Sequence, residues 1–516
     1  MKCFLLLILF PIECLSIYAQ EKWDNIWVLG YLENDSVGGY GGTMLNFSLG
    51  SPHVAYFPLG LDAASNGTAQ ICDSTGNFLF FSNGCEISNY AGQIIENGDQ
   101  INPGYLHDQW CNTIGVDSYK TRQGQIALPW PNRPGEYALF HLGWYQNPDW
   151  PYNRYIRDFY YTHLDMNSND SLGKVLEKNV LLLQNNNLVD NLTAVRHGNG
   201  RDWWLIEPCG LTDSFFLFLL SPSGIEGPFI EQTAVHSNAI GYTAGQVVFS
   251  PDGSKYVRAN YLDGVDIFDF DRCQGKFLSS ERLPYPGDIG TVSVGASISP
   301  SSRFLYVSTL NKLFQYDFFS NDIILSKTLV GQYDGFVDTM TSNLPVSFYQ
   351  HLLAPNGNIY ISVPNTTFYF HVIHQPDMPG VSCDFRQHDL NLATRHGFCV
   401  PNFPFLHLYD APGSLCDTLG ISTTQTCCTP LKGELNKIYV FPNPTNTEKV
   451  NVLIPLSTNG RLKMINTSGQ IIKDLNVSDK EEVILDCSLI SNGIYILIFL
   501  SQELGIVITT KLVVNR

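Results

Sequence analysis

The chain has 516 residues and a formal charge of −18 at pH 7; only 15% of its residues are charged, whereas 13% are aromatic. Nucleic-acid binding needs a basic surface that displaces counterions from phosphates, so this acidic balance excludes it and also argues against docking on anionic lipid. The low charge, the aromatic content, 43 glycines and 28 prolines predict an all-β protein that works outside the cytoplasm.

The first 19 residues have the features of an export signal. Lys2 precedes an apolar run at residues 5–10, which Pro11 breaks before it reaches the roughly 20 residues that span a bilayer. Cleavage is expected between Ala19 and Gln20, because Ala19 is a small residue that ends the segment. The later chain has no long uninterrupted apolar stretch, so we expect no transmembrane segment.

Export favours disulfide bonds, but the cysteines that follow this signal are odd in number and cannot all pair within one chain. Cys72 and Cys85 flank a predicted hairpin and form the pair we expect. Weaker candidate pairs are Cys383 with Cys399, and Cys416 with Cys427 or Cys428.

One unit recurs between residues 20 and 412: a turn with Gly or Ser, then a run of alternating aromatic and β-branched residues. The turn anchors are Gly76, Gly135, Gly200, Gly253, Ser302 and Gly357. Their mean spacing is about 56 residues, so the segment holds about seven units. A single sheet cannot bury both of its faces, and sheets of this period stack around an axis. The repeat therefore predicts a seven-bladed β-propeller, with separate β-sandwiches as the alternative.

A ring of sheets needs a closing contact that removes exposed edges. We expect residues 25–32 to pair with residues 403–410 and so join the two ends of the repeat region in one sheet.

Three phrases in the repeat region are unusual. Residues 199–204 are NGRDWW, residues 370–392 are FHVIHQPDMPGVSCDFRQHDLNL, and residues 401–404 are PNFP. They resemble phrases in the propeller regions of Bacteroidetes surface proteins, although the WxFG opening of that group is replaced here by WVLG at residues 27–30. The resemblance implies a propeller and an external address rather than a chemistry.

Short motifs that carry a mechanism, such as H-E-x-x-H, G-x-S-x-G and the P-loop, do not occur. We therefore predict no catalytic residue, no cofactor and no metal site. His371 and His374 are three residues apart and would face opposite sides of a strand, so they are not expected to share a metal. Asp266, Asp269 and Asp271 are expected at strand ends and are interpreted either as calcium-binding carboxylates or equally as solvated edge charges.

The densest polar–aromatic cluster is His197, Arg201, Asp202, Trp203 and Trp204. In the structural interpretation the two tryptophans face the two neighbouring sheets, and Asp202 pins the turn through Arg201 or the backbone. In the functional interpretation a tryptophan stacks on a sugar ring, which makes all five residues candidates for ligand binding.

A second polar group provides two more candidate ligand-binding residues. Arg386 and His388 lie near Arg395 and His396, and we expect the group on loops or, alternatively, along the axial channel.

Residues 434–516 contain five to seven short apolar runs separated by Asn, Gly, Ser or Pro, which predicts a small β-sandwich. Residues 413–433 are interpreted as a linker. Four blocks occur in order in this region, and their key residues are Pro442, Asn443, Pro444, Gly469, Gly493, Tyr495 and Lys511.

This arrangement resembles the C-terminal type A sorting domain of the bacterial type IX secretion system, which is found in the Bacteroidetes. The resemblance implies recognition by the type IX secretion machinery, translocation across the outer membrane, and removal of the domain on the cell surface.

Together these features predict a secreted or surface-displayed protein that passes through the periplasm. We expect its propeller to act as a binding or adhesion module for a polysaccharide or a protein. The alternatives are a propeller hydrolase or lyase with an axial active site, and a structural component of the cell surface.

Overall fold

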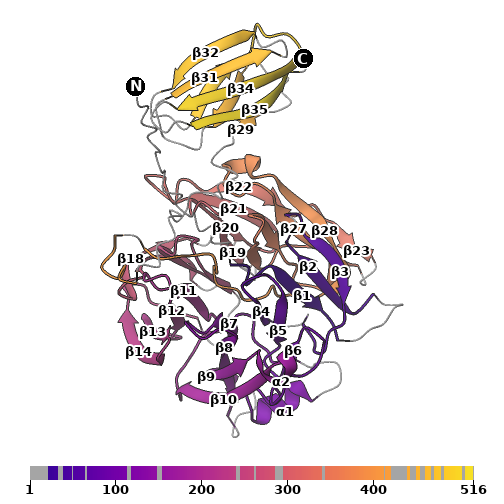
Figure 1. Ribbon diagram of the computed structural model, residues 1–516, viewed down its shortest axis with the longest axis vertical. Coiled ribbons are helices and arrows are strands. Elements are labelled where there is room, and N and C mark those ends of the chain that lie inside the picture. The colour runs from indigo at the N-terminus through magenta and orange to yellow at the C-terminus, as the bar shows by residue number, and fades with distance from the viewer. Residues whose placement is uncertain are drawn as a thin grey trace, which may run out of the picture. The chain divides into compact units, whose positions relative to one another are not determined.

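The computed structural model describes residues 21–32, 39–48, 50–63, 67–112, 118–147, 154–239, 245–260, 263–284, 295–339, 343–411, 413–419, 439–441, 449–453, 460–466, 470–477, 482–501 and 506–514. Several predictions concern residues outside these ranges: the export signal at 1–19 with its cleavage site Ala19 and Gln20, most of the linker, Pro442, Asn443, Pro444 and Gly469. The chain divides into two compact units, Met1–Cys427 and Cys428–Arg516 (Figure 1). Among the described residues, no helix is long and apolar enough to cross a membrane.

The first unit consists of successive antiparallel sheets, most with three or four strands that follow one another in the chain (Figure 1). The first sheet contains β1 (Ile26–Gly30), β2 (Gly42–Asn46) and β3 (His53–Phe57). The second contains β4 (Ala69–Cys72), β5 (Phe78–Ser82) and β6 (Ile87–Asn89). The third contains β7 (Gln125–Pro129), β8 (Glu136–Gln146), β9 (Arg154–Asp165) and β10 (Lys174–Leu183). The fourth sheet contains β11 (Thr193–Arg196), β12 (Trp203–Pro208), β13 (Ser214–Ser221) and β14 (Gly224–Gln232). The fifth contains β15 (Gly245–Phe249), β16 (Lys255–Asn260), β17 (Gly264–Asp271) and β18 (Lys276–Leu283).

The remaining sheets of this unit contain β19 (Gly295–Ile298), β20 (Phe304–Ser308), β21 (Lys312–Asp317) and β22 (Thr328–Gln332); the short pair β23 (Val337–Asp338) and β24 (Leu344–Pro345); and β25 (His351–Leu353), β26 (Ile359–Ile361), β27 (Thr367–Ile373) and β28 (Phe385–His396). Its described helical elements are α1 (Tyr105–Cys111), α2 (Ser168–Ser171) and the 3-10 helix η2 (Gly380–Cys383).

The six repeat anchors occupy the same position in six of these sheets, in the turn between the first and second strands. Every anchor has a left-handed backbone, with φ from 62° at Ser302 to 97° at Gly76. Glycine adopts this conformation without steric cost, which explains why five of the six anchors are glycine. The predicted repeat therefore corresponds to one turn and strand pair in each of these six sheets.

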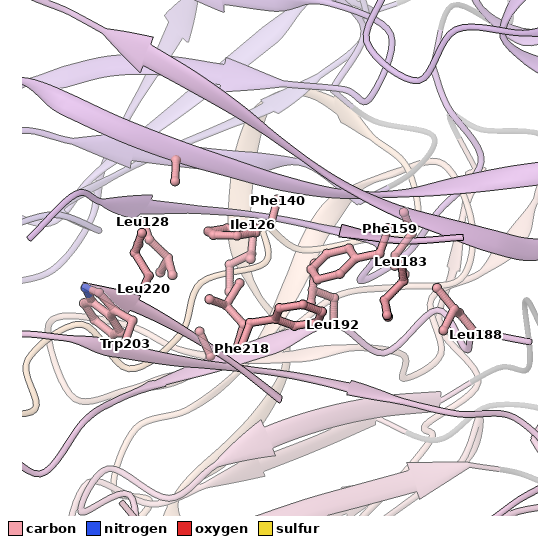
Figure 2. Packing of buried hydrophobic residues seen from close by; sticks show 14 of the residues in the cluster. Ile126, Leu128, Phe140, Phe159, Leu183, Leu188, Leu192, Trp203, Phe218 and Leu220 are labelled. Atoms are coloured by element: carbon pink, nitrogen blue, oxygen red, sulfur yellow. The ribbon is translucent and has the colours of Figure 1, made fainter. Parts of the chain in front are cut away.

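Hydrophobic clusters lie between neighbouring sheets and hold them face to face. Figure 2 shows one of them, in which Ile126 and Phe140 of the β7–β10 sheet pack against Trp203 and Phe218 of the β11–β14 sheet. Equivalent clusters join each later and earlier pair of sheets. One more cluster joins the β25–β28 sheet to the β1–β3 sheet, so the succession of sheets closes on itself.

The predicted pairing of residues 25–32 with residues 403–410 is wrong. β1 pairs with β2, and residues 403–410 contain no strand. Pro404 has no amide hydrogen to donate to a ladder, which disfavours strand pairing there. The first and last sheets instead meet side by side, and the hydroxyls of Thr43 and Thr394 share a hydrogen bond of 2.8 Å across the boundary.

Residues 398–411, here called the strap, run through the place where the first strands of the sheets converge. The Asn402 side chain donates hydrogen bonds to the carbonyls of Gln125 (2.9 Å) and Leu192 (3.0 Å), and its backbone amide donates to Thr68 (2.9 Å). Beside the strap, only a small cavity of about 60 Å³ remains, and it is lined by residues 400–405 and by strands β11, β15, β19 and β25. The chain itself therefore occupies the centre of the ring.

The predicted Cys72–Cys85 disulfide is wrong. Cys85 pairs with Cys111, and Cys72 is a buried free thiol whose pKa is raised by burial. Cys72 lies opposite Phe78 at the turn end of the β4–β5 hairpin, whereas Cys85 follows Ser82 at the other end. The hairpin therefore separates the two cysteines along its length.

A second disulfide joins Cys273 to Cys416. This bond corrects the expectation that Cys416 pairs with Cys427 or Cys428. Cys383 and Cys399, also considered as a pair, are buried free thiols.

The described residues of the second unit form two antiparallel sheets. One sheet comprises β29 (Tyr439–Phe441), β30 (Lys449–Leu453) and β33 (Glu482–Asp486), and the other comprises β31 (Gly460–Asn466), β32 (Ile471–Val477), β34 (Gly493–Ser501) and β35 (Ile506–Val514). Residues of both sheets share one buried cluster, which includes Val452, Leu485, Leu462, Phe499 and Leu512. This cluster is the unit's own hydrophobic core.

Candidate ligand-binding surfaces

The predicted cluster at residues 197–204 is brought together, but mainly to build a turn. Asp202 accepts hydrogen bonds from Arg201 Nε (2.6 Å) and from Asn199 Nδ2 (2.8 Å). The Asn199 side-chain oxygen in turn accepts the backbone amide of Arg201 at 3.0 Å. The hydrogen bond to Asp202 raises the pKa of the Arg201 guanidinium, so the guanidinium stays charged. The expected role of Asp202 in pinning the turn is confirmed.

Trp203 and Trp204 point to opposite faces of their sheet, as the structural interpretation predicts. Trp203 is 0% exposed in the cluster of Figure 2, and the Arg196 guanidinium lies 4.3 Å from its ring centre. Trp204 is 6% exposed and donates its indole hydrogen to the carbonyl of Arg272 at 2.9 Å. Neither indole presents a face on which a sugar ring could stack.

The end of the strap lies against this same turn. The Ala411 amide donates to the carbonyl of Gly198 at 2.8 Å. A side chain at Gly200 would place its Cβ 2.8 Å from the Asp410 nitrogen, so the close approach requires glycine. The strap therefore covers much of the surface that the sequence assigned to a ligand.

Arg386 and His388 lie on β28, the edge strand of its sheet. The expectation that they lie on loops is therefore wrong, and so is the alternative along the axial channel. His388 Nε2 lies 3.0 Å from Asp334 Oδ2, and its ring stacks on Phe336 with centres 4.3 Å apart. Arg386 pairs with Asp384 at 2.7 Å and is largely exposed. This edge is far in sequence from the 197–204 turn and belongs to a different sheet.

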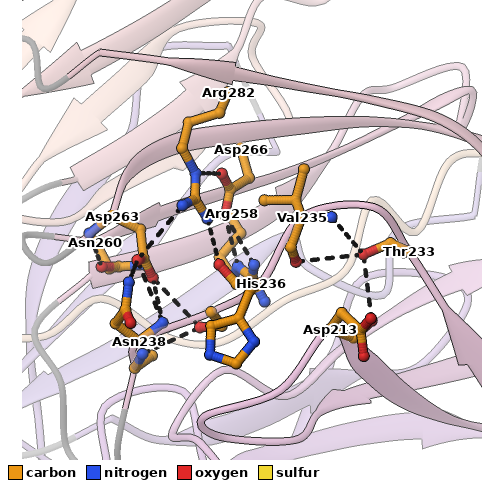
Figure 3. Close-up of polar contacts among 12 residues, drawn as sticks. Asp213, Thr233, Val235, His236, Asn238, Arg258, Asn260, Asp263, Asp266 and Arg282 are labelled. Atoms are coloured by element: carbon orange, nitrogen blue, oxygen red, sulfur yellow. Dashed lines mark hydrogen bonds and ion pairs between the residues drawn. The ribbon is translucent and has the colours of Figure 1, made fainter.

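A buried charge network in the β15–β18 sheet was also missed by the sequence analysis (Figure 3). Arg258 and Asp266 form a 2.8 Å ion pair, with side chains 1% and 0% exposed, and Arg282 Nε lies 2.6 Å from the second Asp266 oxygen. Asp263 accepts a 2.6 Å hydrogen bond from Asn238, which ties the preceding loop to the sheet. Asp266 is therefore a buried structural charge and not a solvated one.

A more open candidate is the turn end of the β8–β9 hairpin, where Arg154 is exposed and Tyr145, Tyr155 and Arg157 are partly buried. The two strands pair as far as Gln146 and Arg154, whereas flanking β7 begins opposite His141 and flanking β10 ends opposite Phe159. We call residues 144–147 and 154–157 the hairpin end. Eight of the 18 residues from 144 to 161 are aromatic, a density that could have revealed this feature from the sequence.

Aromatic rings and cations alternate at the hairpin end. Tyr145 and Tyr155 lie opposite each other with ring centres 5.5 Å apart, and the Arg157 guanidinium lies 4.2 Å from the Tyr145 ring centre. On the other strand face, Arg154 approaches Trp110 of α1 at 5.9 Å. Such pairs present an apolar body with polar edges, the chemistry that binding surfaces use most.

Contacts with helix α1 and Tyr119 hold the hairpin end in place. Trp144 packs edge-to-face on Trp110, and its backbone amide donates to the Tyr119 hydroxyl at 2.9 Å. The Cys85–Cys111 disulfide fastens the helix that carries Trp110. A pre-ordered surface loses little conformational entropy when a ligand binds.

Electrostatics keep the charge state of this surface constant. Arg157 makes a two-pronged ion pair with buried Asp158, and that hydrogen bonding raises the pKa of the guanidinium. Burial, followed by the charge of Asp158, raises the pKa of Tyr160 to about 12. Arg157 therefore stays charged and Tyr160 stays neutral throughout the physiological pH range.

Three of the predicted sorting-domain residues lie among the described ones. Gly493 and Tyr495 are on β34, where the Tyr495 hydroxyl donates to the carbonyl of Ser491 at 2.9 Å. Lys511 is on β35 directly opposite Ile496. The last two strands thus bring the final two sequence blocks side by side.

Residues 439–515 match the family model described as a secretion system C-terminal sorting domain. This type IX sorting domain directs export, so the protein is secreted or displayed on the outer cell surface. No curated protein matches the chain.

Solved structures similar to this chain include a candidate 6-phosphogluconolactonase from Bacteroides fragilis, with 12% identity, coverage of 72% of this chain and 96% of that one, and a TM-score of 0.42. The Dos1 propeller has 9% identity, coverage of 67% and 91%, and a TM-score of 0.35. PorZ, a surface component of the type IX secretion system of Porphyromonas gingivalis, has 9% identity, coverage of 92% and 68%, and a TM-score of 0.26. At these TM-scores the similarities carry no argument about function.

Proposed function

We propose that this is a bacterial surface or secreted binding module, in which a seven-bladed β-propeller meets a polysaccharide or a protein. The observation that carries the proposal is the hairpin end, where Tyr145, Tyr155 and Arg157 form a partly buried cluster of rings and a guanidinium. Interfaces concentrate binding energy in residues of these types. The strap supports a binding site away from the axis, because the chain itself occupies the centre of the ring.

The seven-bladed architecture is supported by the interleaved packing of the sheets. Each three- or four-stranded sheet of the first unit shares one hydrophobic cluster with the sheet before it and another with the sheet after it. We propose likewise that residues 434–516 form a β-sandwich, which the shared core of its two sheets supports.

The route to the surface is part of the proposal. A signal peptide at residues 1–19 takes the chain to the periplasm, and the type IX machinery of a member of the Bacteroidetes then recognises residues 434–516. Residues 413–433 serve as the linker between the propeller and this sorting domain.

The proposal is tested by measuring how the purified full-length protein binds to a panel of bacterial, algal and host polysaccharides and proteins. We expect a saturable partner whose affinity falls at least about tenfold in Tyr155→Ala and in Arg157→Ala, as for central interface residues. Tyr56→Ala is the matched control, because Tyr56 is 49% exposed on β3 of another sheet. Product masses from the same incubations report any turnover, and a chain that converts its partner or binds none contradicts the proposal.

Arg386 and His388 define a second candidate surface for the same function. Phe336, Tyr369 and His388 form a half-buried ring cluster beside the exposed Arg386. Loss of binding in His388→Ala with normal binding in Tyr155→Ala would move the site to this edge.

A further inference from the structure

The Cys273–Cys416 disulfide joins two parts of the chain that only the complete ring brings together. Cys273 lies between β17 and β18, and Cys416 follows the strap, 143 residues later. All strands from β18 to β28 come between them. The other disulfide, Cys85–Cys111, spans only 26 residues and closes a local loop.

The strap end is seated by specific contacts before it reaches this disulfide. Arg272 Nη1 donates to the Tyr409 carbonyl at 2.8 Å, and its Nη2 donates to the Asp410 carbonyl at 3.3 Å. A Cβ at Gly198 would lie 2.5 Å from Cys416 Sγ, so the turn at 197–202 packs directly on the bonded sulfur. The NGRDWW turn, the β17–β18 turn and the strap end therefore meet at one place.

The strap also holds the beginning of the first sheet. His407 Nε2 lies 2.9 Å from Asp24 Oδ1, and Arg196, which donates to the Leu406 carbonyl, also pairs with Glu21 at 3.3 Å. Because the first and last sheets share no strand, these contacts supply a connection between the chain ends that strand pairing does not.

We propose that the strap and the Cys273–Cys416 disulfide form a redox clasp, which closes after the sheets have assembled and then locks the strap in the centre of the ring. The PNFP phrase supplies the buried anchor Asn402, and the NGRDWW turn supplies the seat for the strap end. Reduction of the clasp frees the strap end and loosens the centre of the ring.

The chemistry needs an oxidant that carries a disulfide, either a protein or a small molecule. The thiolate of one cysteine attacks that disulfide and forms a mixed disulfide, which releases one thiolate of the oxidant. The thiolate of the other cysteine then attacks the mixed disulfide and displaces the second. The two cysteines lose two protons and two electrons in all, and the oxidant leaves as two thiols.

The order of disulfide formation tests the clasp. Reduced, unfolded full-length chain is refolded with oxidised glutathione, quenched with an alkylating reagent at successive times, and mapped by mass spectrometry. We expect Cys85–Cys111 to form before Cys273–Cys416. Asn402→Ala, which unseats the strap, should slow only the second bond, by about tenfold if seating precedes oxidation. Equal rates for the two bonds, or an unchanged Cys273–Cys416 rate in Asn402→Ala, would overturn the proposal.

Amide hydrogen exchange on the folded chain provides a second measurement. In Cys273→Ser/Cys416→Ser the strap amides, including those of Asn402 and Ala411, should exchange at least about tenfold faster than in the parent. Cys85→Ser/Cys111→Ser is the matched control and should leave the strap protected. If the clasp variant does not fold, mild reduction of the folded parent replaces it, and strap protection that survives reduction rules out the clasp.

Discussion

Two clusters of rings and arginines in the first unit have similar composition and opposite surroundings. At the NGRDWW turn, Arg196 lies over Trp203, and both are buried beneath the strap and the neighbouring sheet. At the hairpin end, Arg157 lies over Tyr145, and both are only partly buried. Composition alone therefore does not distinguish a packing cluster from a binding surface; what lies over the rings does.

Trp203→Ala is expected to show the largest difference between the two clusters. Removing a fully buried indole leaves a cavity and costs about 3–5 kcal/mol of unfolding free energy. Chemical denaturation measures this loss, with Tyr155→Ala at the hairpin end as the control. A loss below about 1 kcal/mol in Trp203→Ala would contradict the buried assignment.

Arg272→Ala removes the guanidinium that holds the strap end. Hydrogen bonds from a charged donor to the Tyr409 and Asp410 carbonyls are lost, so we expect a destabilisation of about 2–3 kcal/mol and faster strap exchange. The control is Arg154→Ala, whose guanidinium is exposed at the hairpin end. Equal losses of unfolding free energy in Arg272→Ala and Arg154→Ala would contradict the proposed difference between the buried strap end and the hairpin end.

His407 makes the contact between the strap and Asp24 sensitive to pH. Burial lowers the pKa of His407, but the charge of Asp24 and its hydrogen bond outweigh burial, so the pKa is raised. The pair's stabilisation is therefore complete below the unfolded value near 6.5 and is lost as pH rises through the folded pKa.

A histidine pKa that is one unit higher in the folded than in the unfolded state corresponds to about 1.4 kcal/mol of stabilisation. The stability difference between parent and His407→Gln should therefore shrink between pH 6 and pH 9, as measured by urea denaturation at each pH. A difference that grows with pH has the wrong sign for this pair.

Tyr155→Ala is expected to have the smallest effect on stability and the largest effect on binding. The ring is only partly buried, so its loss should cost less unfolding free energy than loss of the fully buried Trp203, while the affinity for the partner falls. Binding should also be insensitive to pH between 6 and 9, because Arg157 and Tyr160 keep their charge states there. A strong pH dependence would place the binding site away from the hairpin end.

Much of the fold was predictable because its signals are local. Each anchor turn needs a left-handed residue beside a β-rich run, and five glycines and Ser302 record that need at regular spacing. The address was predictable for the same reason, since the four C-terminal blocks lie within about 80 residues and match a sorting-domain model at 439–515.

The disulfides and the closing contact were not predictable in this way. Cys72 and Cys85 flank a hairpin in the sequence, but strand register places them at opposite ends of it. Cys416 finds its partner 143 residues away, and no local pattern records that distance.

The amino-acid sequence thus carries the repeat, the turns and the export address, because turn geometry and strand periodicity depend on neighbours along the chain. Tertiary structure alone decides that Trp203 is fully covered and Tyr155 only partly, that the strap runs through the centre of the ring, and which cysteines meet. The physical reason is that burial and pairing depend on which distant segments come together, and that arrangement exists only once the ring has closed.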